Sequence, residues 1–254
     1  MDEKRRFRYR LRDFDLSDPA SKREYNRRLF SPVAEVYPLV TRFLSFGRDA
    51  AWKRNLIRAL PRDGVGRILD LACGPGDLTF RLALHYSAAK IDGVDLSSAM
   101  LSRANAALEA SPPELRDRVA FLEGDMNQLP FEDESFDLVT GGYALRNSPD
   151  LGRTLSEIAR MLKPGGRAAF LDFSRSARPG LSAIQTGLLA FWGRLWGRIL
   201  HRNPEVYGYI AESLRAFPDA TAFDQMLSEA GFELLLSRGY MFGLLRITMI
   251  RKRA

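Results

Sequence analysis

The fold of this chain is decided by residues 68–80, which read Ile-Leu-Asp-Leu-Ala-Cys-Gly-Pro-Gly-Asp-Leu-Thr-Phe. An apolar run over 67–71 carries an acid near its end, and the chain then passes through two glycines into a helical pattern. This order predicts a strand, a tight turn and a helix N-terminus, which is where an open α/β sheet binds a nucleotide-like ligand. Gly74 and Gly76 can adopt positive φ angles, and because they lack a Cβ a ligand can lie close to the backbone.

The turn differs from a dinucleotide-binding fingerprint. That fingerprint reads G-x-G-x-x-G, and Thr79 stands where the third glycine would be. Asp70, just before the turn, also favours a ligand with positive charge over a pyrophosphate. Cys73 is the one cysteine of the chain, which excludes an internal disulfide framework, and we expect it to serve packing inside the turn.

Two further predicted strands are followed by acids. Residues 90–94 lead into Asp95, about twenty residues after the glycine turn, where a carboxylate can accept both hydroxyls of a ribose. After 119–123, Asp125 is placed to bond an adenine amino group and Met126 to pack on the ring. The glycine turn, Asp95 and Asp125 could each, taken alone, be an ordinary turn residue or a solvent-exposed acid. Together they follow one another in order at the spacing of βαβ units, which favours a common binding site. The ligand that fits them together is S-adenosylmethionine, which has an amino-acid end, a sulfonium and an adenosine.

The composition describes a globular chain with an excess of positive charge. Its 254 residues are 46% hydrophobic, and 38 lysines and arginines against 31 acids give a net charge of +7. Basic residues gather at 4–12 and 251–253, which permits a nucleic acid or an anionic membrane as partner. Arginine-rich proteins from GC-rich genomes often carry the same excess with no such partner. We expect no metal site, since there is no cysteine/histidine cluster, and no signal peptide, since the N-terminus is charged.

Helical and strand patterns alternate along the chain. After a polar segment at 1–25, residues 26–60 predict two helices joined around 45–47. Residues 163–166, Lys-Pro-Gly-Gly, are expected to end a helix and turn the chain into a strand. The alternation predicts a parallel sheet with right-handed crossovers. Strands are expected at 67–71, 90–94, 119–123, 136–141 and 167–173, helices near 77–86, 98–109, 151–162 and 221–230, and a closing antiparallel hairpin at 232–237 and 244–250.

The segment 181–200 departs from this alternation. Its wide apolar face is interrupted by Arg194 and Arg198, and it holds too many charges and glycines to span a membrane. It is expected to be either an amphipathic lid over an apolar substrate, in contact with a bilayer, or a core helix that covers the sheet.

Three stretches resemble one enzyme family. They are Phe43-Leu44-Ser45-Phe46-Gly47 with Trp52-Lys53-Arg54, then Leu145-Arg146-Asn147, and then Tyr207-x-Tyr209-x-x-Glu212-Ser213-x-Arg215-x-Phe217-Pro218. With the cofactor turn, they make residues 30–235 similar to the ubiquinone/menaquinone biosynthesis C-methyltransferases, the UbiE-like group of class I methyltransferases. The resemblance implies an α/β, Rossmann-like fold: a mostly parallel seven-stranded sheet with an antiparallel C-terminal strand and helices on both faces. It implies a basic arm with capping helices at 1–60 and a methyltransferase domain at 61–254, in which 181–218 form a lid or substrate insertion.

The activity implied by the resemblance is transfer of a methyl group from S-adenosylmethionine to a ring carbon of a demethylmenaquinol or a related quinol. Arg146 and Asn147 are expected to orient the phenol oxygen, and Asp172 or Tyr207 to act as the base. Positioning supplies most of the catalysis because the sulfonium is already activated. The expected substrate contacts are Tyr37, Phe46, Tyr143, Tyr209 and Arg215. The expected cofactor contacts are Asp70, Ala72, Gly74, Pro75, Gly76, Asp95, Leu96, Asp125, Met126 and Gly142, with S-adenosylhomocysteine as product.

The sequence departs from the family pattern near the expected site. Pro75 and Gly142 replace the usual threonine and serine, and Tyr37 is followed by Pro38 where the family has aspartate. These changes leave the cofactor assignment in place and the acceptor open. The alternatives are a small-molecule methyltransferase of secondary metabolism and a subunit of a quinone-synthesis complex that binds the cofactor without turnover.

The expected partners follow from the same comparison. A nucleic-acid substrate is not expected, because residues 141–147 replace the Asn/Asp-Pro-Pro-Tyr stretch of amino methyltransferases. We expect a cytoplasmic protein with peripheral contact to the inner face of an anionic membrane, through 181–200 and the basic N-terminus. Whether it is a homodimer stays open.

Overall fold

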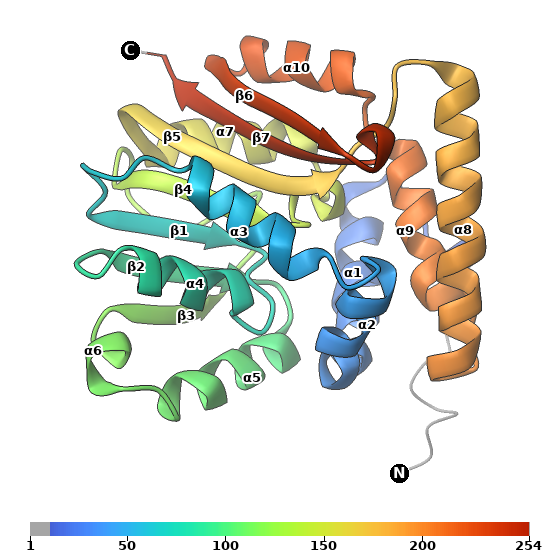
Figure 1. Ribbon diagram of the computed structural model, residues 1–254, viewed down its shortest axis with the longest axis horizontal. Coiled ribbons are helices and arrows are strands. Elements are labelled where there is room, and N and C mark those ends of the chain that lie inside the picture. Colours follow the sequence, from blue (N-terminus) through green and yellow to red (C-terminus); the bar gives the residue numbers. More distant parts are fainter. Residues whose placement is uncertain (1–10, 254) are drawn as a thin grey trace.

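The computed structural model describes residues 11–253, and the basic residues at 4–10 lie outside this range. Its seven strands form one sheet in the order β3-β2-β1-β4-β5-β7-β6 (Figure 1). Strands β1 to β5 are parallel, and β7 is antiparallel to both β5 and β6. The predicted mostly parallel sheet with an antiparallel C-terminal strand is confirmed. The strands are β1 (Arg67–Leu71), β2 (Lys90–Asp95), β3 (Val119–Glu123), β4 (Phe136–Gly142), β5 (Leu162–Phe173), β6 (Phe232–Tyr240) and β7 (Leu245–Lys252).

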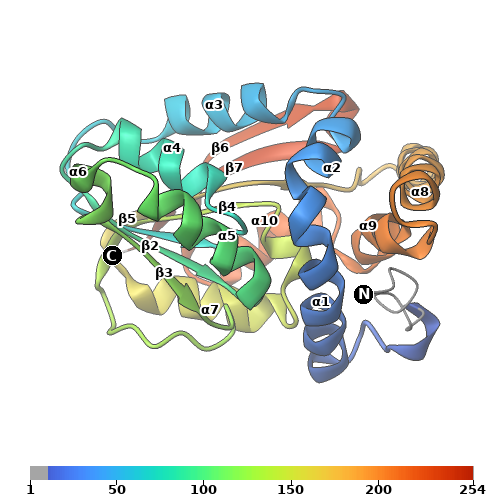
Figure 2. The ribbon, with the colours of Figure 1, turned by 90° about the horizontal axis from the view of Figure 1, so that it is seen from below.

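Helices pack on both faces of the sheet. Because successive strand side chains point to opposite faces, Ile68 packs with Leu56 of α3 on one face and Leu69 with Ile158 of α7 on the other. Figure 2 shows α3 and α4 on one side of the sheet and α7 on the opposite side. The helices are α1 (Pro19–Val33), α2 (Tyr37–Leu44), α3 (Asp49–Ala59), α4 (Asp77–His85), α5 (Ser98–Glu109), α6 (Pro113–Arg116), α7 (Leu151–Met161), α8 (Pro179–His201), α9 (Glu205–Ala216) and α10 (Ala220–Glu229). Short 3₁₀ turns are η2 (Leu11–Asp13), η3 (Ala34–Val36), η4 (Leu145–Asn147) and η5 (Met241–Gly243).

The first helix is longer than the sequence pattern predicted. It begins at Pro19, and Asp18 caps it by accepting a hydrogen bond from the backbone N–H of Ser21 at 2.7 Å. An aspartate cap followed by proline is a common helix start, and the prediction overlooked it. As a result α1 carries Lys22 and Asn26 into the buried part of the molecule.

The prediction for residues 163–166 was wrong in one respect. They do not separate a helix from a strand, because α7 ends at Met161 and β5 begins at Leu162. Leu162 already pairs with Phe136, and after a register shift the regular pairing continues from Arg167. The four residues are therefore an irregular part of β5, of the kind a bulge produces.

Four helices stand at the carboxyl edge of the sheet. In Figure 1, α1, α2, α8 and α9 lie beside the ends toward which the arrows of β1 and β5 point. Two glycines let α8 approach the chain around α9 closely. A Cβ at Gly193 would overlap the carbonyl oxygen of Tyr207, and one at Gly197 would lie 2.6 Å from the carbonyl oxygen of Asn203. The segment 181–200 thus forms a long helix packed against α9.

No helix in the described part of the chain is long and apolar enough to cross a bilayer.

We expect Gly193→Ala to lower the free energy of unfolding by about 2 kcal/mol, because the added methyl group must push α8 away from the backbone of Tyr207. Gly187→Ala in the same helix is the matched control, since its Cβ would meet nothing within 4 Å. The control should gain up to about 1 kcal/mol, because alanine is the better helix former. Chemical denaturation measures both, and an equal response would contradict the close approach.

Candidate active site

One carboxylate fastens the glycine turn to the end of β2. Asp95 Oδ2 accepts a hydrogen bond from the backbone N–H of Gly74 at 2.8 Å, and its Oδ1 accepts one from Ser97 at 2.9 Å. Gly74 and Gly76 have φ angles of +56° and +86°, which glycine adopts without strain. Burial raises the pKa of Asp95, while the backbone hydrogen bonds favour its ionised form. The turn and the carboxylate therefore face the same space.

A small cavity lies at this turn. Most of the expected cofactor contacts line it, namely Ala72, Gly74, Asp95, Leu96, Asp125, Met126 and Gly142. Helix α1 narrows the cavity to about 60 Å³, with Phe30 in its wall and Arg23 paired to Asp125 at 2.5 Å. The acceptor oxygens of Asp95, the apolar side chain of Met126 and the bare backbone at Gly74 fit S-adenosylmethionine.

Three of the expected cofactor contacts do not line this cavity: Asp70, Pro75 and Gly76. Asp70 is fully buried and accepts hydrogen bonds from Thr79 at 2.7 Å and Thr140 at 2.8 Å. Burial raises the pKa of Asp70 to about 6. A Cβ on Gly76 would lie 2.8 Å from the ring of Phe121. Asp70 and Gly76 therefore stabilise the turn through contacts inside the protein, on the side away from the cavity.

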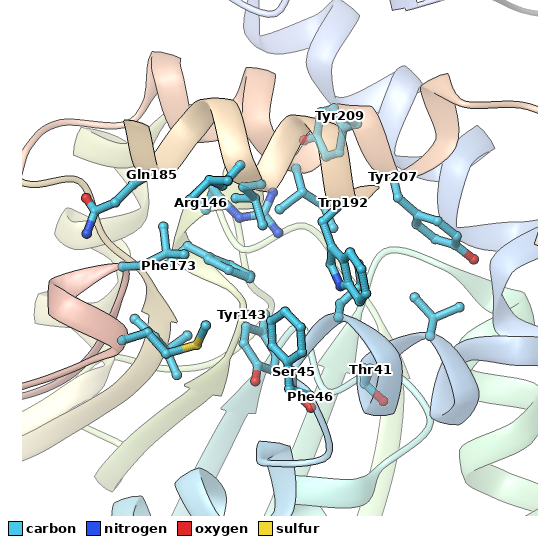
Figure 3. A pocket seen from close by; sticks show the side chains of 18 of the residues that line it. Thr41, Ser45, Phe46, Tyr143, Arg146, Phe173, Gln185, Trp192, Tyr207 and Tyr209 are labelled. Atoms are coloured by element: carbon cyan, nitrogen blue, oxygen red, sulfur yellow. The ribbon is translucent and has the colours of Figure 1, made fainter. Parts of the chain in front are cut away.

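A larger cavity of about 590 Å³ opens beside the first, walled by side chains from α1, α2, α8, α9 and η5 (Figure 3). The wall is mostly aliphatic and aromatic, and the volume is typical of sites for organic ligands of drug size. Phe46, Tyr207 and Tyr209 line it, as the sequence predicted for a substrate site. Both cavities share a wall formed by Phe30, Tyr37, Tyr143 and Asn147. A group bound in one cavity can therefore lie against a group bound in the other.

Arg146 is the one charged side chain among the described residues that line the larger cavity. It is buried, and its Nη1 donates a hydrogen bond to Ser213 Oγ at 2.5 Å. Its Nε lies 3.9 Å from Asp172 Oδ1 and has no hydrogen-bond partner. The guanidinium also stands 5.4 Å from the ring centre of Phe173. A buried N–H without a partner beside an apolar cavity favours an oxygen of a ligand as that partner.

Asn147 offers an acceptor next to this arginine. Its Nδ2 donates to the carbonyl of Tyr143 at 2.9 Å, whereas its buried Oδ1 has no partner. The backbone carbonyl of Asn147 accepts a hydrogen bond from Asn26 Nδ2 at 2.7 Å, and Asn26 Oδ1 accepts one from the hydroxyl of Tyr209 at 2.6 Å. Asn26 of α1 is thus hydrogen-bonded to both Asn147 and Tyr209, two residues that the sequence predicted at the site.

Lys22 is a second buried cation, close to Arg146 although it lines neither cavity, and no sequence pattern pointed to it. It is buried, and burial together with the charge of Arg146 lowers its pKa to about 8. The negative charge of Asp172 partly offsets this and raises the pKa of Lys22. Lys22 and Asn26 stand four residues apart on one face of α1, so a helix start recognised at Asp18 would have linked them.

Three residues expected at the substrate site differ from the prediction, because Tyr207 lines the cavity but turns its hydroxyl toward His201, and Asp172 and Arg215 do not line it. The hydroxyl of Tyr207 bonds His201 Nε2 at 2.7 Å and points away from Arg146 in Figure 3. Asp172 does not line the cavity; its Oδ2 accepts the backbone N–H of Arg146 at 3.1 Å, and burial raises its pKa. Arg215 is exposed, forms an ion pair with Glu212, and does not line the cavity.

A buried ionic network supports Tyr143 in the shared wall. Its hydroxyl donates to Asp49 Oδ1 at 2.8 Å, and Lys53 Nζ lies 2.9 Å from Asp49 Oδ2 and 2.8 Å from Asp77 Oδ2. The backbone of Tyr143 has a φ of +61°, a strained value for a residue with a side chain. The sequence signal for this network was the Trp52-Lys53-Arg54 stretch, whose role could not be deduced from the chain alone.

Comparison with known proteins finds one enzyme family and one fold. The model of the ubiE/COQ5 methyltransferase family matches residues 19–252. A demethylmenaquinone methyltransferase of Thermus thermophilus is 35% identical over 206 residues, covering 81% of this chain and 92% of the relative. A 2-phytyl-1,4-naphtoquinone methyltransferase of Nostoc punctiforme is 34% identical over 225 residues, covering 88% and 96%. Among solved structures, the 4+2 cyclase SpnF has a similar fold, with a TM-score of 0.66 at 18% identity over 90% of this chain and 96% of that one.

Proposed function

This chain belongs to the ubiE/COQ5 methyltransferase family, and we propose that it methylates a ring carbon of a demethylmenaquinol or a related quinol. The observation that carries the proposal is the pair of cavities with a common wall. The wall of the larger one is mostly apolar and includes Arg146 and Asn147, which suits a hydrophobic aromatic acceptor with a phenol oxygen. The smaller one holds the carboxylate and glycine turn that suit the methyl donor.

Asp95, Gly74 and Met126 are the residues proposed to hold S-adenosylmethionine. Asp95 would accept the ribose hydroxyls, and Gly74 allows close approach to the backbone. When bound, this cofactor supplies a methyl group already activated on a sulfonium, and S-adenosylhomocysteine is the product. The task left to the protein is to hold the acceptor carbon in line with that methyl group and to exclude water.

Arg146 is proposed to stabilise the acceptor as a phenolate, which makes the neighbouring ring carbon nucleophilic. A guanidinium in a buried site with low effective dielectric stabilises a developing oxyanion strongly. Lys22 adds positive charge nearby, and Asp172 holds the backbone of Arg146 in place. Asp172 is thus better described as a positioning residue than as the base.

The tyrosines of the larger cavity are poor bases. Burial raises the pKa of Tyr37 and Tyr209 to about 12, and it raises the pKa of Tyr143 and Tyr207 as well. A phenolate form of any of them is therefore rare near neutral pH. We propose that the field of Arg146 and Lys22 lowers the pKa of the acceptor phenol itself, so that its proton passes to bulk water as the quinol binds, without a tyrosine base. After the ring carbon has taken the methyl group from the sulfonium, the hydrogen on that carbon is released as a proton and the ring becomes aromatic again.

The setting proposed for this reaction follows from the acceptor. A prenylated quinol resides in a bilayer, so a cytoplasmic enzyme must meet it at the inner face of the membrane. A homodimer is compatible with this arrangement but is not required by it, since residues from one copy line both cavities.

The test is turnover of methyl-labelled S-adenosylmethionine with chemically reduced demethylmenaquinol and with a demethylated benzoquinol. Label on a ring carbon of either product, located by mass spectrometry, is the expected result. Binding of the cofactor without transfer to either quinol would overturn the proposal and favour a subunit that does not turn over. Transfer only to an unrelated aromatic acceptor would favour secondary metabolism.

A further inference from the structure

The outer side of α8 carries an apolar stripe that faces solvent. Ile184, Leu188, Phe191, Leu195 and Ile199 follow one another at helical spacing, and their exposed fractions lie between 37% and 67%. Fifteen residues separate the first from the last, so the stripe is about 22 Å long. The opposite side of α8 is already packed inward, with Gly193 and Gly197 against the chain around α9. Helix α8 therefore has two apolar faces. One packs against the chain around α9, and the outer stripe takes no part in that packing.

Two aromatic side chains project beside this stripe from other parts of the chain. Phe46, in the turn between α2 and α3, is 57% exposed, and Phe242, in η5, is 92% exposed. Both have positive φ angles, +51° and +56°, which cost of order 1 kcal/mol for a residue with a side chain. The backbone is thus strained at both projecting aromatic residues.

The stripe and the two aromatic residues surround the larger cavity. Ile184, Leu188 and Phe191 line that cavity although they are more than half exposed, and so do Phe46 and Phe242. Apolar side chains of the cavity wall are thus also part of the apolar outer surface. We call this opening of the larger cavity its mouth. Exposing so many apolar side chains to water is unfavourable, whereas contact with hydrocarbon is favourable.

The charges around this surface are positive. Helix α8 contains no acidic residue, and Arg194 and Arg198 are exposed next to the stripe. Arg194 has one acidic neighbour, Glu212, at 4.0 Å. The turn that carries Phe46 is flanked by exposed Arg42 and Arg48. Apolar side chains bordered by arginines match the acyl and phosphate layers of an anionic bilayer, whereas a second copy of this surface would bring like charges together.

We infer that the outer stripe of α8, with Phe46 and Phe242, docks on an anionic lipid bilayer so that the mouth of the larger cavity opens into the lipid. The role of this docking rests on the proposed function. A prenylated acceptor could pass from the membrane into the cavity without crossing water. The docking itself requires only the surface described above. It places lipid contact on the folded domain, independently of the basic residues at 4–12.

The experiment is co-sedimentation with vesicles of phosphatidylcholine alone or mixed with phosphatidylglycerol. The unaltered protein should bind the mixed vesicles and lose binding in high salt, since exposed charges are screened. Leu195→Gln with Ile199→Gln, which lie on the stripe but do not line the cavity, should weaken binding at least tenfold. Leu84→Gln is the matched control, because Leu84 is 74% exposed on α4 and should leave binding unchanged. Melting curves verify that each variant is folded.

Two further measurements keep the outcomes distinct. Arg194→Gln with Arg198→Gln should weaken binding to the mixed vesicles, whereas Arg103→Gln on α5 should not. Turnover of a short-tailed, water-soluble quinol should be unaffected by Leu195→Gln with Ile199→Gln, so loss of docking is separable from failure of the proposed function.

Equal vesicle binding by the stripe variant and the Leu84 control would overturn the inference. A dimer that the stripe variant dissociates, with no vesicle binding by the unaltered protein, would also overturn it and assign the surface to a second copy.

Discussion

Arg146→Gln is expected to lower kcat/KM for the quinol by about 10²- to 10³-fold, the usual cost of removing one donor that stabilises an oxyanion. The Kd for S-adenosylmethionine should stay within about twofold, because Arg146 lines the acceptor cavity and not the smaller one. Glutamine ends where the Nε of the arginine stands and is too short to reach Ser213, so the change removes the positive charge and this hydrogen bond while part of the packing remains. Steady-state turnover and isothermal titration measure the two quantities.

The matched control is Arg215→Gln. Arg215 belongs to the same family-like sequence pattern, yet it is exposed and bonded to Glu212. Its replacement should change kcat/KM by less than about threefold, since surface ion pairs contribute little. Equal losses for the two variants would contradict the role of Arg146. A melting temperature recorded for each variant separates a catalytic loss from unfolding, because an unpaired Asp172 beside the site destabilises the fold.

Asp95→Asn is expected to raise the Kd for S-adenosylmethionine by about 10- to 100-fold, the range for losing hydrogen bonds to a charged acceptor. The carboxylate accepts from the backbone of Gly74 and Ser97, and an amide cannot replace both of its acceptor oxygens. The variant therefore loosens the glycine turn as well as losing the proposed ribose contact. Titration of the cofactor measures the change.

Asp92→Asn on the same strand is the control for Asp95→Asn. Asp92 lies 3.4 Å from Arg67 and does not line either cavity, so the Kd should be unchanged. At saturating cofactor the kcat of Asp95→Asn should recover most of its value, because Asp95 does not line the acceptor cavity. An unchanged Kd in Asp95→Asn would place the cofactor elsewhere.

The part of the site that we propose to hold the cofactor was largely predictable, because its polar residues follow the ends of strands in chain order. A parallel sheet brings the carboxyl ends of β1 and β2 together, so the contact between Asp95 and the turn at Gly74 follows from topology alone. The prediction was less accurate where side-chain direction mattered. Asp70 belongs to the same motif but points into the protein toward Thr79 and Thr140, and a motif does not specify that direction.

The acceptor half depended more on tertiary structure. Arg146 and Arg215 both came from family-like stretches, yet Arg146 is buried at the cavity and Arg215 faces solvent. Lys22 and Asn26 had no sequence signal of their own, because nothing local indicates that α1 returns to cover β-strand ends far along the chain.

The sequence by itself predicted the mostly parallel sheet and the residues proposed to hold the methyl donor, since apolar runs and turn residues act within a few positions. Only the tertiary structure decided the shape of the acceptor cavity and which of the residues 179–216 face it. Two helices that bury one side each can rotate and slide against one another, and the close contact of Gly193 with the backbone of Tyr207 selects one arrangement. That contact, made between different helices, decides which side of α8 packs against α9 and leaves Ile184, Leu188 and Phe191 exposed at the larger cavity.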